Sequence, residues 1–246
     1  MNIFVTGTDT GVGKTIITAG LAGVMQSLGY QMGVYKPIQS GAELKKGKFV
    51  SPDLEFVKSI DRNIRTKTTY MLKTPCAPSL AAFLESVKIY KNRLKIDYEN
   101  LRESCDFTIV EGAGGILCPI SNDYMVRDLA KQLGLPVLIV ARSGLGTINH
   151  TLLTIEAARL GGLDVLGVIF SDYPAGTNDI SIKTAPEIIS NLSSVKVFGC
   201  LPSIPELKSH CACPDLPEIL LDKVLNNIDI QGIFDIIIPK LSVQPQ

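Results

Sequence analysis

The chain has 246 residues, 46% of them hydrophobic and 20% charged, which is typical of a globular protein with a substantial core. Lys plus Arg and Asp plus Glu number 24 each, so no net charge attracts nucleic acid or an anionic membrane, and neither is an expected partner. The apolar runs are too short to span a membrane and no basic leader is evident, which favours a cytoplasmic protein.

The first predicted elements are a strand and a buried helix joined by a glycine-rich loop. Residues 2–6 are rich in strand-forming side chains, and residues 15–28 carry apolar side chains around most of a helix. The loop sequence VTGTDTGVGKT (5–15) ends in the Gly-Lys-Thr of a phosphate-binding loop. Its spacing departs from the usual pattern, because Thr8 stands where the first glycine is expected and Gly7 comes one position early.

The loop residues have the properties that a nucleotide site needs. Gly11 and Gly13 allow the backbone to approach a phosphate closely, and N–H groups at the start of the helix attract an anion. Lys14 can reach the β- and γ-phosphates, and the hydroxyl of Thr15 can bind Mg²⁺. A glycine turn without function is the alternative, but the flanking strand and helix favour nucleotide binding.

The second predicted strand carries a lysine towards the same edge of the sheet. Residues 31–36 (QMGVYK) favour a strand that Pro37 is expected to end, which places Lys36 beside the phosphate loop. Such a lysine is a candidate for neutralising charge in phosphoryl transfer, with an ordinary surface lysine as the alternative. The following helix, 52–60, has Asp53 in its first turn, where an acid can also simply favour the helix dipole.

A third segment, DFTIVEGAGG (106–115), combines a predicted strand over 106–112 with an acid and glycines at its carboxyl end. Folds with a phosphate loop place a second metal contact there, which makes Glu111 a candidate ligand. Gly112 and Gly114 would let the backbone pass close to the γ-phosphate. A strand end followed by a loose turn is the alternative interpretation.

The remaining predicted elements alternate between strands and helices. Strands are expected at 135–141, 163–171 and 195–201, and helices at 97–105, 125–133, 147–160 and 178–192. Apolar strands separated by helices predict a doubly wound, mostly parallel α/β sheet. We expect 202–227 to be loop with one helix and 229–239 to be a short helix or an edge strand. A single domain (1–228) would then precede a C-terminal helix or tail (229–246).

Two further patterns have competing interpretations. Free N–H groups at Thr147, Ile148 and Asn149, a predicted helix start, could bind a carboxylate, although an ordinary capped helix is the alternative. The six cysteines form no disulfide framework and are interpreted as reduced thiols. The HCAC stretch at 210–213 lacks a second cluster to complete a metal site, so an incidental loop is expected there.

Together these stretches resemble the dethiobiotin synthetase family of P-loop NTPases, and their order and spacing fit that family from residue 2 to about 205. The matching segments are VTGTDTGVGKT (5–15), YKPIQSG (35–41), Asp53 of SPD, VEGAGG (110–115), LPV with GLGTINHTLLT (135–154), and the Leu-Pro of GCLP (199–202). The family's loop is enlarged by one residue after its first glycine, which accounts for the early position of Gly7.

The resemblance implies an ATP- and Mg²⁺-dependent ligase of biotin biosynthesis. In this family 7,8-diaminopelargonic acid takes up CO₂ as a carbamate, and ATP phosphorylates the carbamate to a carbamic–phosphoric anhydride. The second amine then attacks the carbonyl and closes the cyclic urea of dethiobiotin. No covalent enzyme intermediate is expected, in keeping with the lack of a recognisable nucleophile–base pair in the sequence.

The resemblance also assigns residues to each partner. Lys14, Lys36 and Thr10 are the implied catalytic residues, and Ser40 is implied to bind substrate beside Thr10 and Lys36. The implied ligands of Mg²⁺ are Thr15, Asp53 and Glu111. The implied nucleotide site comprises Gly11, Val12, Gly13, Lys14, Thr15, Ile16, Asp53, Glu111, Gly112, Ala113, Gly114, Ser171, Asp172, Pro202, Ser203 and Ile204.

The resemblance further implies a homodimer with a shared site. The substrate carboxylate would lie against Thr147, Ile148 and Asn149 of the neighbouring protomer. Two positions depart from the family. Relatives often carry Glu where this chain has Gly11, and they usually read adenine with an Asn where this chain has Ser171. Because a hydroxyl offers fewer contacts than an amide, we expect weaker discrimination among nucleoside triphosphates.

Two other classes of protein share this fold. Partition and division-site ATPases, which assemble rather than make a metabolite, carry a lysine near the start of the loop, where this chain has Asp9. Amidating ligases of corrin synthesis would need a further glutaminase domain, for which 246 residues leave no room. The opposite charge of Asp9 and the segment YKPIQSG (35–41) favour the synthetase.

Overall fold

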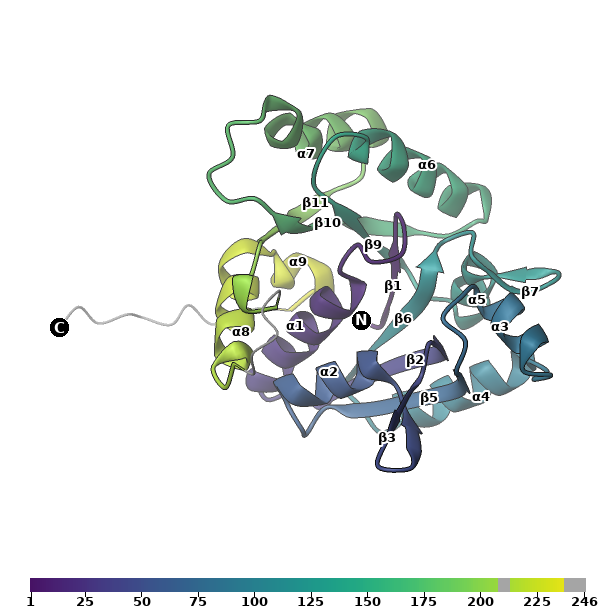
Figure 1. Cartoon of the computed structure of the whole chain (residues 1–246). Helices are drawn as coiled ribbons and strands as arrows, with labels where there is room; N and C mark the ends of the chain where they lie inside the picture. Colours follow the sequence, from purple (N-terminus) through teal and green to yellow (C-terminus); the bar gives the residue numbers. More distant parts are fainter. Residues whose placement is uncertain (208–212, 237–246) are drawn as a thin grey trace.

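A sheet of seven strands lies at the centre of the computed structural model, which describes residues 1–207 and 213–236 (Figure 1). The strand order is β11-β10-β9-β1-β6-β2-β5, and every neighbouring pair is parallel. The strands are β1 (Ile3–Gly7), β2 (Met32–Ser40), β5 (Arg65–Leu72), β6 (Phe107–Gly115), β9 (Val137–Arg142), β10 (Val165–Tyr173) and β11 (Val197–Pro202). The predicted doubly wound parallel sheet is confirmed, with the phosphate-loop strand at its centre.

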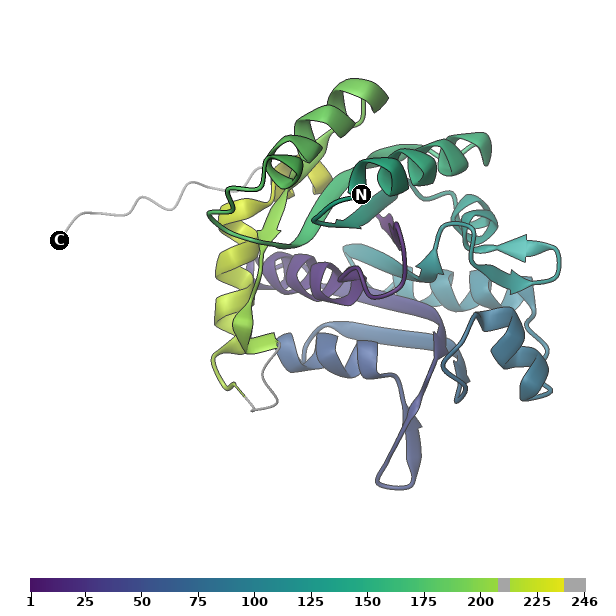
Figure 2. The ribbon, with the colours of Figure 1, turned by 45° about the horizontal axis from the view of Figure 1, so that its top comes forward.

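Helices cover both faces of this sheet, as Figure 2 shows from a second direction. One face carries α1 (Lys14–Ser27), α2 (Pro52–Ile60), α8 (Leu216–Asn227) and α9 (Ile230–Phe234), and the other carries α3 (Pro78–Leu84), α4 (Lys91–Arg102), α5 (Val126–Leu133), α6 (Thr147–Leu160) and α7 (Ile180–Ser193). Each face has its own apolar cluster. Along β1, Ile3 and Val5 belong to the first cluster and Phe4 to the second, which explains why the central strands are apolar throughout.

Most helices begin and end where local signals predict. Gly13 precedes α1 with φ 95°, and Gly134 ends α5 with φ 66°, a left-handed conformation that glycine adopts without strain. The helix expected at 229–239 is confirmed over Ile230–Phe234, and residues 237–239 lie outside the described chain. No helix within 1–207 and 213–236 is long and apolar enough to cross a membrane.

Two glycines of α1 allow neighbouring helices to approach closely. A Cβ atom at Gly20 would lie 2.6 Å from Cγ2 of Val224 in α8. A Cβ atom at Gly23 would lie 2.8 Å from Cγ2 of Ile60 in α2. Helix α8 therefore packs directly on the helix that follows the phosphate loop.

Two strands differ from the predictions. The expectation that Pro37 ends β2 is wrong, since the strand continues to Ser40. Beyond Tyr35 only β5 pairs with it, and a proline, which has no N–H, is tolerated where a strand has a free side. β5 itself was not expected, because its sequence RTKTTYML (65–72) is polar and half-buried at the edge of the sheet.

The helix expected at 97–105 is also displaced. α4 begins at Lys91, and Asp97, its predicted first residue, lies in the middle of the helix. The Asp97 carboxylate is 4% exposed and accepts hydrogen bonds from Thr69 (2.8 Å) and Arg93 (3.0 Å) instead of capping a helix. The shorter elements α3, β3 (Glu43–Lys45), β4 (Lys48–Val50), β7 (Pro119–Ser121), β8 (Tyr124–Met125) and a single 3-10 turn (Pro205–Leu207) were not predicted either.

Candidate functional site: a phosphate loop between two pockets

A pocket of about 660 Å³ opens at the carboxyl ends of β1, β2 and β6. Its lining includes predicted residues from the phosphate loop, β2, α2 and β6: Thr10, Gly11, Gly13, Lys14, Thr15, Ile16, Lys36, Ser40, Asp53, Glu111, Ala113 and Gly114. Ile38, Gln39, Cys118 and the wall at 75–78 also line the pocket and were not among the predicted site residues. The first three of these have sequence neighbours in the predicted site, which was the only available signal.

The phosphate loop closes tightly on itself at its first glycine. A Cβ atom at Gly7 would lie 2.7 Å from Cγ2 of Val12 and 3.0 Å from Nζ of Lys14, so the early glycine lies where the enlarged loop folds back. The Lys14 side chain crosses the loop, and its Nζ donates to the carbonyl of Asp9 at 3.0 Å. Burial, and next the charge of Lys36, lowers the pKa of Lys14 to about 8.

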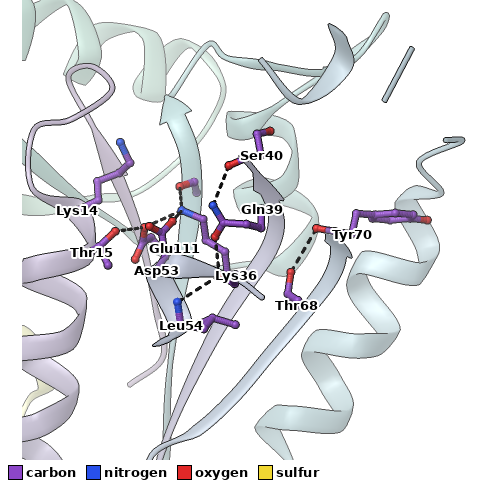
Figure 3. Close-up of polar contacts among 12 residues, drawn as sticks. Lys14, Thr15, Lys36, Gln39, Ser40, Asp53, Leu54, Thr68, Tyr70 and Glu111 are labelled. Carbon is purple, nitrogen blue, oxygen red and sulfur yellow. Dashed lines mark hydrogen bonds and ion pairs between the residues drawn. The ribbon is translucent and has the colours of Figure 1, made fainter. Parts of the chain in front are cut away.

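An ammonium group bridges two carboxylates beside this loop (Figure 3). Nζ of Lys36 lies 2.6 Å from Oδ2 of Asp53 and 2.7 Å from Oε1 of Glu111. The Thr15 hydroxyl donates to the same Glu111 oxygen at 2.9 Å. Burial alone would lower the pKa of Lys36, but Glu111 and then Asp53 outweigh burial, so its pKa lies above the ordinary lysine value. The lysine is therefore held as a buried cation.

The same oxygens suit a magnesium ion. Thr15, Asp53 and Glu111 come from α1, α2 and β6, and all three lie within one hydrogen-bonded cluster. Mg²⁺ in nucleotide sites takes one or two carboxylates, completed by phosphate oxygens and water, and does not need an all-protein cage. Within the described chain no group of three or more His, Cys, Asp or Glu side chains is gathered.

A second pocket, of about 360 Å³, lies on the other side of the phosphate loop. Gly11, Gly13 and Ile16 line both pockets, so the loop is their common wall. Predicted residues Val12, Ser171, Asp172, Pro202 and Ile204 complete one part of the lining, and Arg142, Ser143, Leu201 and Leu207, which the sequence did not indicate, complete the rest.

The polar residues expected at the nucleotide base differ in their placement. Ser171 is 1% exposed, and its side chain packs under the phosphate loop, where a Cβ atom at Gly13 would collide with it. Ser203 does not line this pocket but an adjoining groove beside α8. Gly112 contributes its carbonyl, which accepts from Lys36 at 3.3 Å.

The residues expected to hold the substrate carboxylate lie outside both pockets. Thr147 is 2% exposed and donates its hydroxyl to the carbonyl of Arg142 at 2.6 Å, whereas Asn149 is exposed at the start of α6. The structure therefore does not bring Thr147, Ile148 and Asn149 to the site of their own chain. Their predicted role is in a partner's site.

The thiols within the described chain are free, as expected. Cys76 and Cys118 line the larger pocket, and burial raises the pKa of Cys118 despite the nearby charge of Lys14. The first three residues of the HCAC stretch at 210–213 lie outside the described residues.

Comparison with known proteins gives one consistent set of sequence relatives. A family model described as an AAA domain matches residues 1–210. Proteins named ATP-dependent dethiobiotin synthetase match with high coverage. The one from Thermodesulfovibrio yellowstonii is 33% identical over 95% of this chain and 98% of its own, and the one from Bacillus subtilis is 39% identical over 92% and 98%. That from Anoxybacillus flavithermus is 39% identical over 81% and 90%.

The similar solved structures share the fold at much lower sequence identity. The MinC:MinD cell division complex of Aquifex aeolicus matches with a TM-score of 0.59 and 16% identity, over 97% of both chains. A ParA family ATPase from Chlorobium tepidum matches with a TM-score of 0.51 and 13% identity, over 94% of this chain and 92% of its own. These matches confirm the doubly wound parallel fold and carry no information on activity.

Proposed function

This chain belongs to the ATP-dependent dethiobiotin synthetase family, and from that membership we propose that it converts 7,8-diaminopelargonic acid, CO₂ and ATP into dethiobiotin, with Mg²⁺ as the metal. The observation that carries the proposal is the cluster of Lys36, Asp53, Glu111 and Thr15 beside the phosphate loop. The family membership names the reaction, and the cluster supplies the charges that this reaction needs.

The reaction brings the phosphates of ATP and the carbamate together, and their negative charges must be neutralised. Lys14 and Lys36 are the two cations placed to do so. When bound, ATP with Mg²⁺ supplies the phosphoryl group that activates the carbamate. Lys14, at the loop, is placed for the phosphates, while Lys36, in the middle of β2, lines the pocket in which the carbamate would lie. Preorganised cations in a buried site stabilise developing negative charge without reorganising, which is the largest contribution in many enzymes.

The substrate end of the pocket has a polar and an apolar part. The Ser40 hydroxyl is buried and has no hydrogen-bond partner in the described chain, so it is available to a carbamate oxygen, with Thr10 across the pocket. Ile38, Pro75 and Pro78 supply apolar surface for the methylene chain of the substrate. We assign Thr10 and Ser40 to the carbamate on this basis.

The remaining assignments concern the base and a second protomer. We assign the adenine base to the smaller pocket, between the phosphate loop and Pro202. We assign the substrate carboxylate to Thr147, Ile148 and Asn149 of a dimer partner, because free N–H groups at a helix start favour an anion. The support for the second assignment is that Asn149 is exposed at the start of α6 and outside both pockets of its own chain.

The decisive test is product analysis. The purified protein is supplied with ATP, Mg²⁺, ¹³C-bicarbonate and 7,8-diaminopelargonic acid, and the reaction is followed by mass spectrometry. We expect a cyclic urea that carries one ¹³C atom, with stoichiometric release of phosphate and no product in excess EDTA. ATP hydrolysis that proceeds equally without the diamine, and yields no urea, would replace this proposal with the partition and division-site ATPase, which the fold alone would also allow.

A further inference from the structure

Gln39 is a buried polar residue in the pocket wall to which neither the family resemblance nor the proposed function assigns a role. Its side chain is 5% exposed and makes two hydrogen bonds (Figure 3). Nε2 donates to the carbonyl of the adjacent Ser40 at 2.8 Å, and Oε1 accepts from the hydroxyl of Ser51 at 2.5 Å. The amide therefore uses both its donor and its acceptor, which fixes its orientation.

Ser51 in turn holds the start of α2. It is 4% exposed, and its hydroxyl oxygen accepts from the N–H of Leu54 at 3.2 Å, as the N-cap of the helix. Because its proton is donated to Gln39 and its lone pair faces Leu54, the hydroxyl cannot rotate without losing one bond. The first turn that it caps contains Asp53, whose Oδ2 contacts Lys36.

The hydrogen bond between Gln39 and Ser51 connects two positions that are 12 residues apart in the chain. The hairpin β3–β4, which Figure 1 shows projecting from the molecule, lies between the two residues. All three residues of β3 are exposed, and so are two of the three in β4, so the hairpin does little to hold the start of α2. The hydrogen bond between Gln39 and Ser51 therefore links the end of β2 directly to the N-terminus of α2, and Gln39 lines the pocket.

We infer that Gln39 is a positioning residue for the metal and carbamate sites. Through Ser51 it fixes where Asp53 presents its carboxylate, and through the Ser40 carbonyl it fixes the residue at the carbamate end. The inference rests on the proposed function for the identity of the reaction. In structural terms, the amide of Gln39 fixes the position of the α2 N-terminus relative to the end of β2.

The test separates metal binding from nucleotide binding. Calorimetry measures the affinity for ADP without metal, and then the affinity for Mg²⁺ of the ADP-loaded protein, in wild type, Gln39→Met, Ser51→Gly and the double variant. Methionine keeps the volume of Gln39 and removes both bonds, and glycine remains acceptable as an N-cap while removing the hydroxyl. Ser59→Ala removes an exposed hydroxyl from the same helix and is the matched control.

We expect each variant to bind Mg²⁺ roughly tenfold more weakly and to bind metal-free ADP as wild type does, because residues 10–16 are untouched. The double variant should lose less than the sum of the two single losses, since both single variants remove the bond between Gln39 and Ser51. Unchanged Mg²⁺ affinity in Gln39→Met, or additive losses in the double variant, would overturn the inference. A failure of the proposed function would be seen separately, as a wild-type protein that binds Mg²⁺ and makes no cyclic urea.

Discussion

Lys36 is the residue on which the electrostatics of the site depend. It is 5% exposed, and its ammonium is the closest cation to both carboxylates of the expected metal site. Removing one partner from such a buried ion pair typically costs about 3–5 kcal/mol, because the remaining charge is left uncompensated. That figure is an upper limit here, since the Asp53 side chain is 26% exposed. Replacing Lys36 should therefore affect folding as well as catalysis.

The first prediction concerns Lys36→Gln. Without metal the thermal midpoint should fall, because Asp53 and Glu111 lose their cation, and millimolar Mg²⁺ should raise the midpoint more than in wild type. Turnover should fall by about 10²–10³ while ATP affinity changes little. Calorimetry and initial-rate kinetics check both effects. Lys14→Gln, which acts at the phosphates, should instead lower turnover and ATP affinity together. If Lys36→Gln lowered turnover and ATP affinity mildly and equally, Lys36 would have no specific role in catalysis.

The second prediction concerns the metal ligands. Asp53→Asn and Glu111→Gln keep the side-chain shape but remove a charge, and each should reduce turnover by about 10²–10³ and raise the Mg²⁺ concentration needed for half-maximal rate. Glu55→Gln is the control, because Glu55 lies in the same helical turn as Asp53 and is exposed. Turnover of Asp53→Asn near the Glu55→Gln value would remove Asp53 from the site.

The third prediction concerns the nucleotide base. A hydroxyl makes fewer contacts with adenine than an Asn amide, and the Ser171 side chain is itself packed under the phosphate loop. We therefore expect CTP, GTP and UTP to compete with ATP more effectively than they do in Ser171→Asn, as measured by turnover in competition. Strong rejection of the other bases by wild type, unchanged in Ser171→Asn, would exclude this position from base recognition.

At the scale of elements, α8 packs against α1, the helix that follows the phosphate loop. It packs on α1 where Gly20 leaves room for the Val224 side chain, and on the same helix Gly23 leaves room for Ile60 of α2. The glycines weaken an isolated helix, since each costs about 1 kcal/mol relative to alanine. The gain is that three helices approach closely enough to share one apolar cluster over the sheet.

The fourth prediction follows from that contact. Gly20→Ala should destabilise the protein by about 1–2 kcal/mol, although alanine is the better helix former, because its Cβ would lie 2.6 Å from a methyl of Val224. Urea denaturation measures the change. Gly20→Ala should cost less in a Val224→Ala background than in wild type, since Val224→Ala removes both γ-methyl groups, including the one that the new Cβ would crowd. Stabilisation by Gly20→Ala alone would show that α8 does not press on α1.

At the scale of the whole molecule, the larger pocket has no basic side chain besides Lys14 and Lys36 among the residues that the structure describes. The helix start at 147–149 lies outside its own pockets, and Leu145 and Leu153 nearby are 89% and 60% exposed. Exposed apolar residues around a polar helix start suit a two-fold interface in which each chain completes the other's site. In the proposed dimer, each chain would therefore contribute residues to the active site of its partner.

The fifth prediction tests that sharing. Asn149→Asp sets a carboxylate against the substrate carboxylate, and Lys36→Gln disables the other half of the site, so each variant alone should be nearly inactive. Mixed and allowed to exchange, they should regain about a quarter of wild-type activity, because half of the dimers then contain one intact site. Sedimentation should show a dimer. Full activity in a monomer, or no recovery on mixing, would contradict a shared site.

The elements that the sequence determined by itself are those specified by neighbouring residues. The loop 5–15 between an apolar strand and a buried helix and the glycines that begin or end helices are local patterns, and the structure has them where they were predicted. Glu111 was expected at a strand end and instead lies in the middle of β6, which continues to Gly115. Membership of the family follows from the same segments, because their order along the chain is part of the sequence.

Tertiary packing decided what depends on residues far apart in the chain. The polar strand β5 forms because β2 offers it a free edge, Asp97 is buried because Thr69 and Arg93 satisfy it, and β2 passes Pro37 because one of its sides is unpaired. Packing likewise joins Lys36 to Glu111, 75 positions away, and Gln39 to Ser51 across a hairpin. Such contacts satisfy buried polar groups only once the sheet and both helix layers are assembled, and no local pattern can specify them.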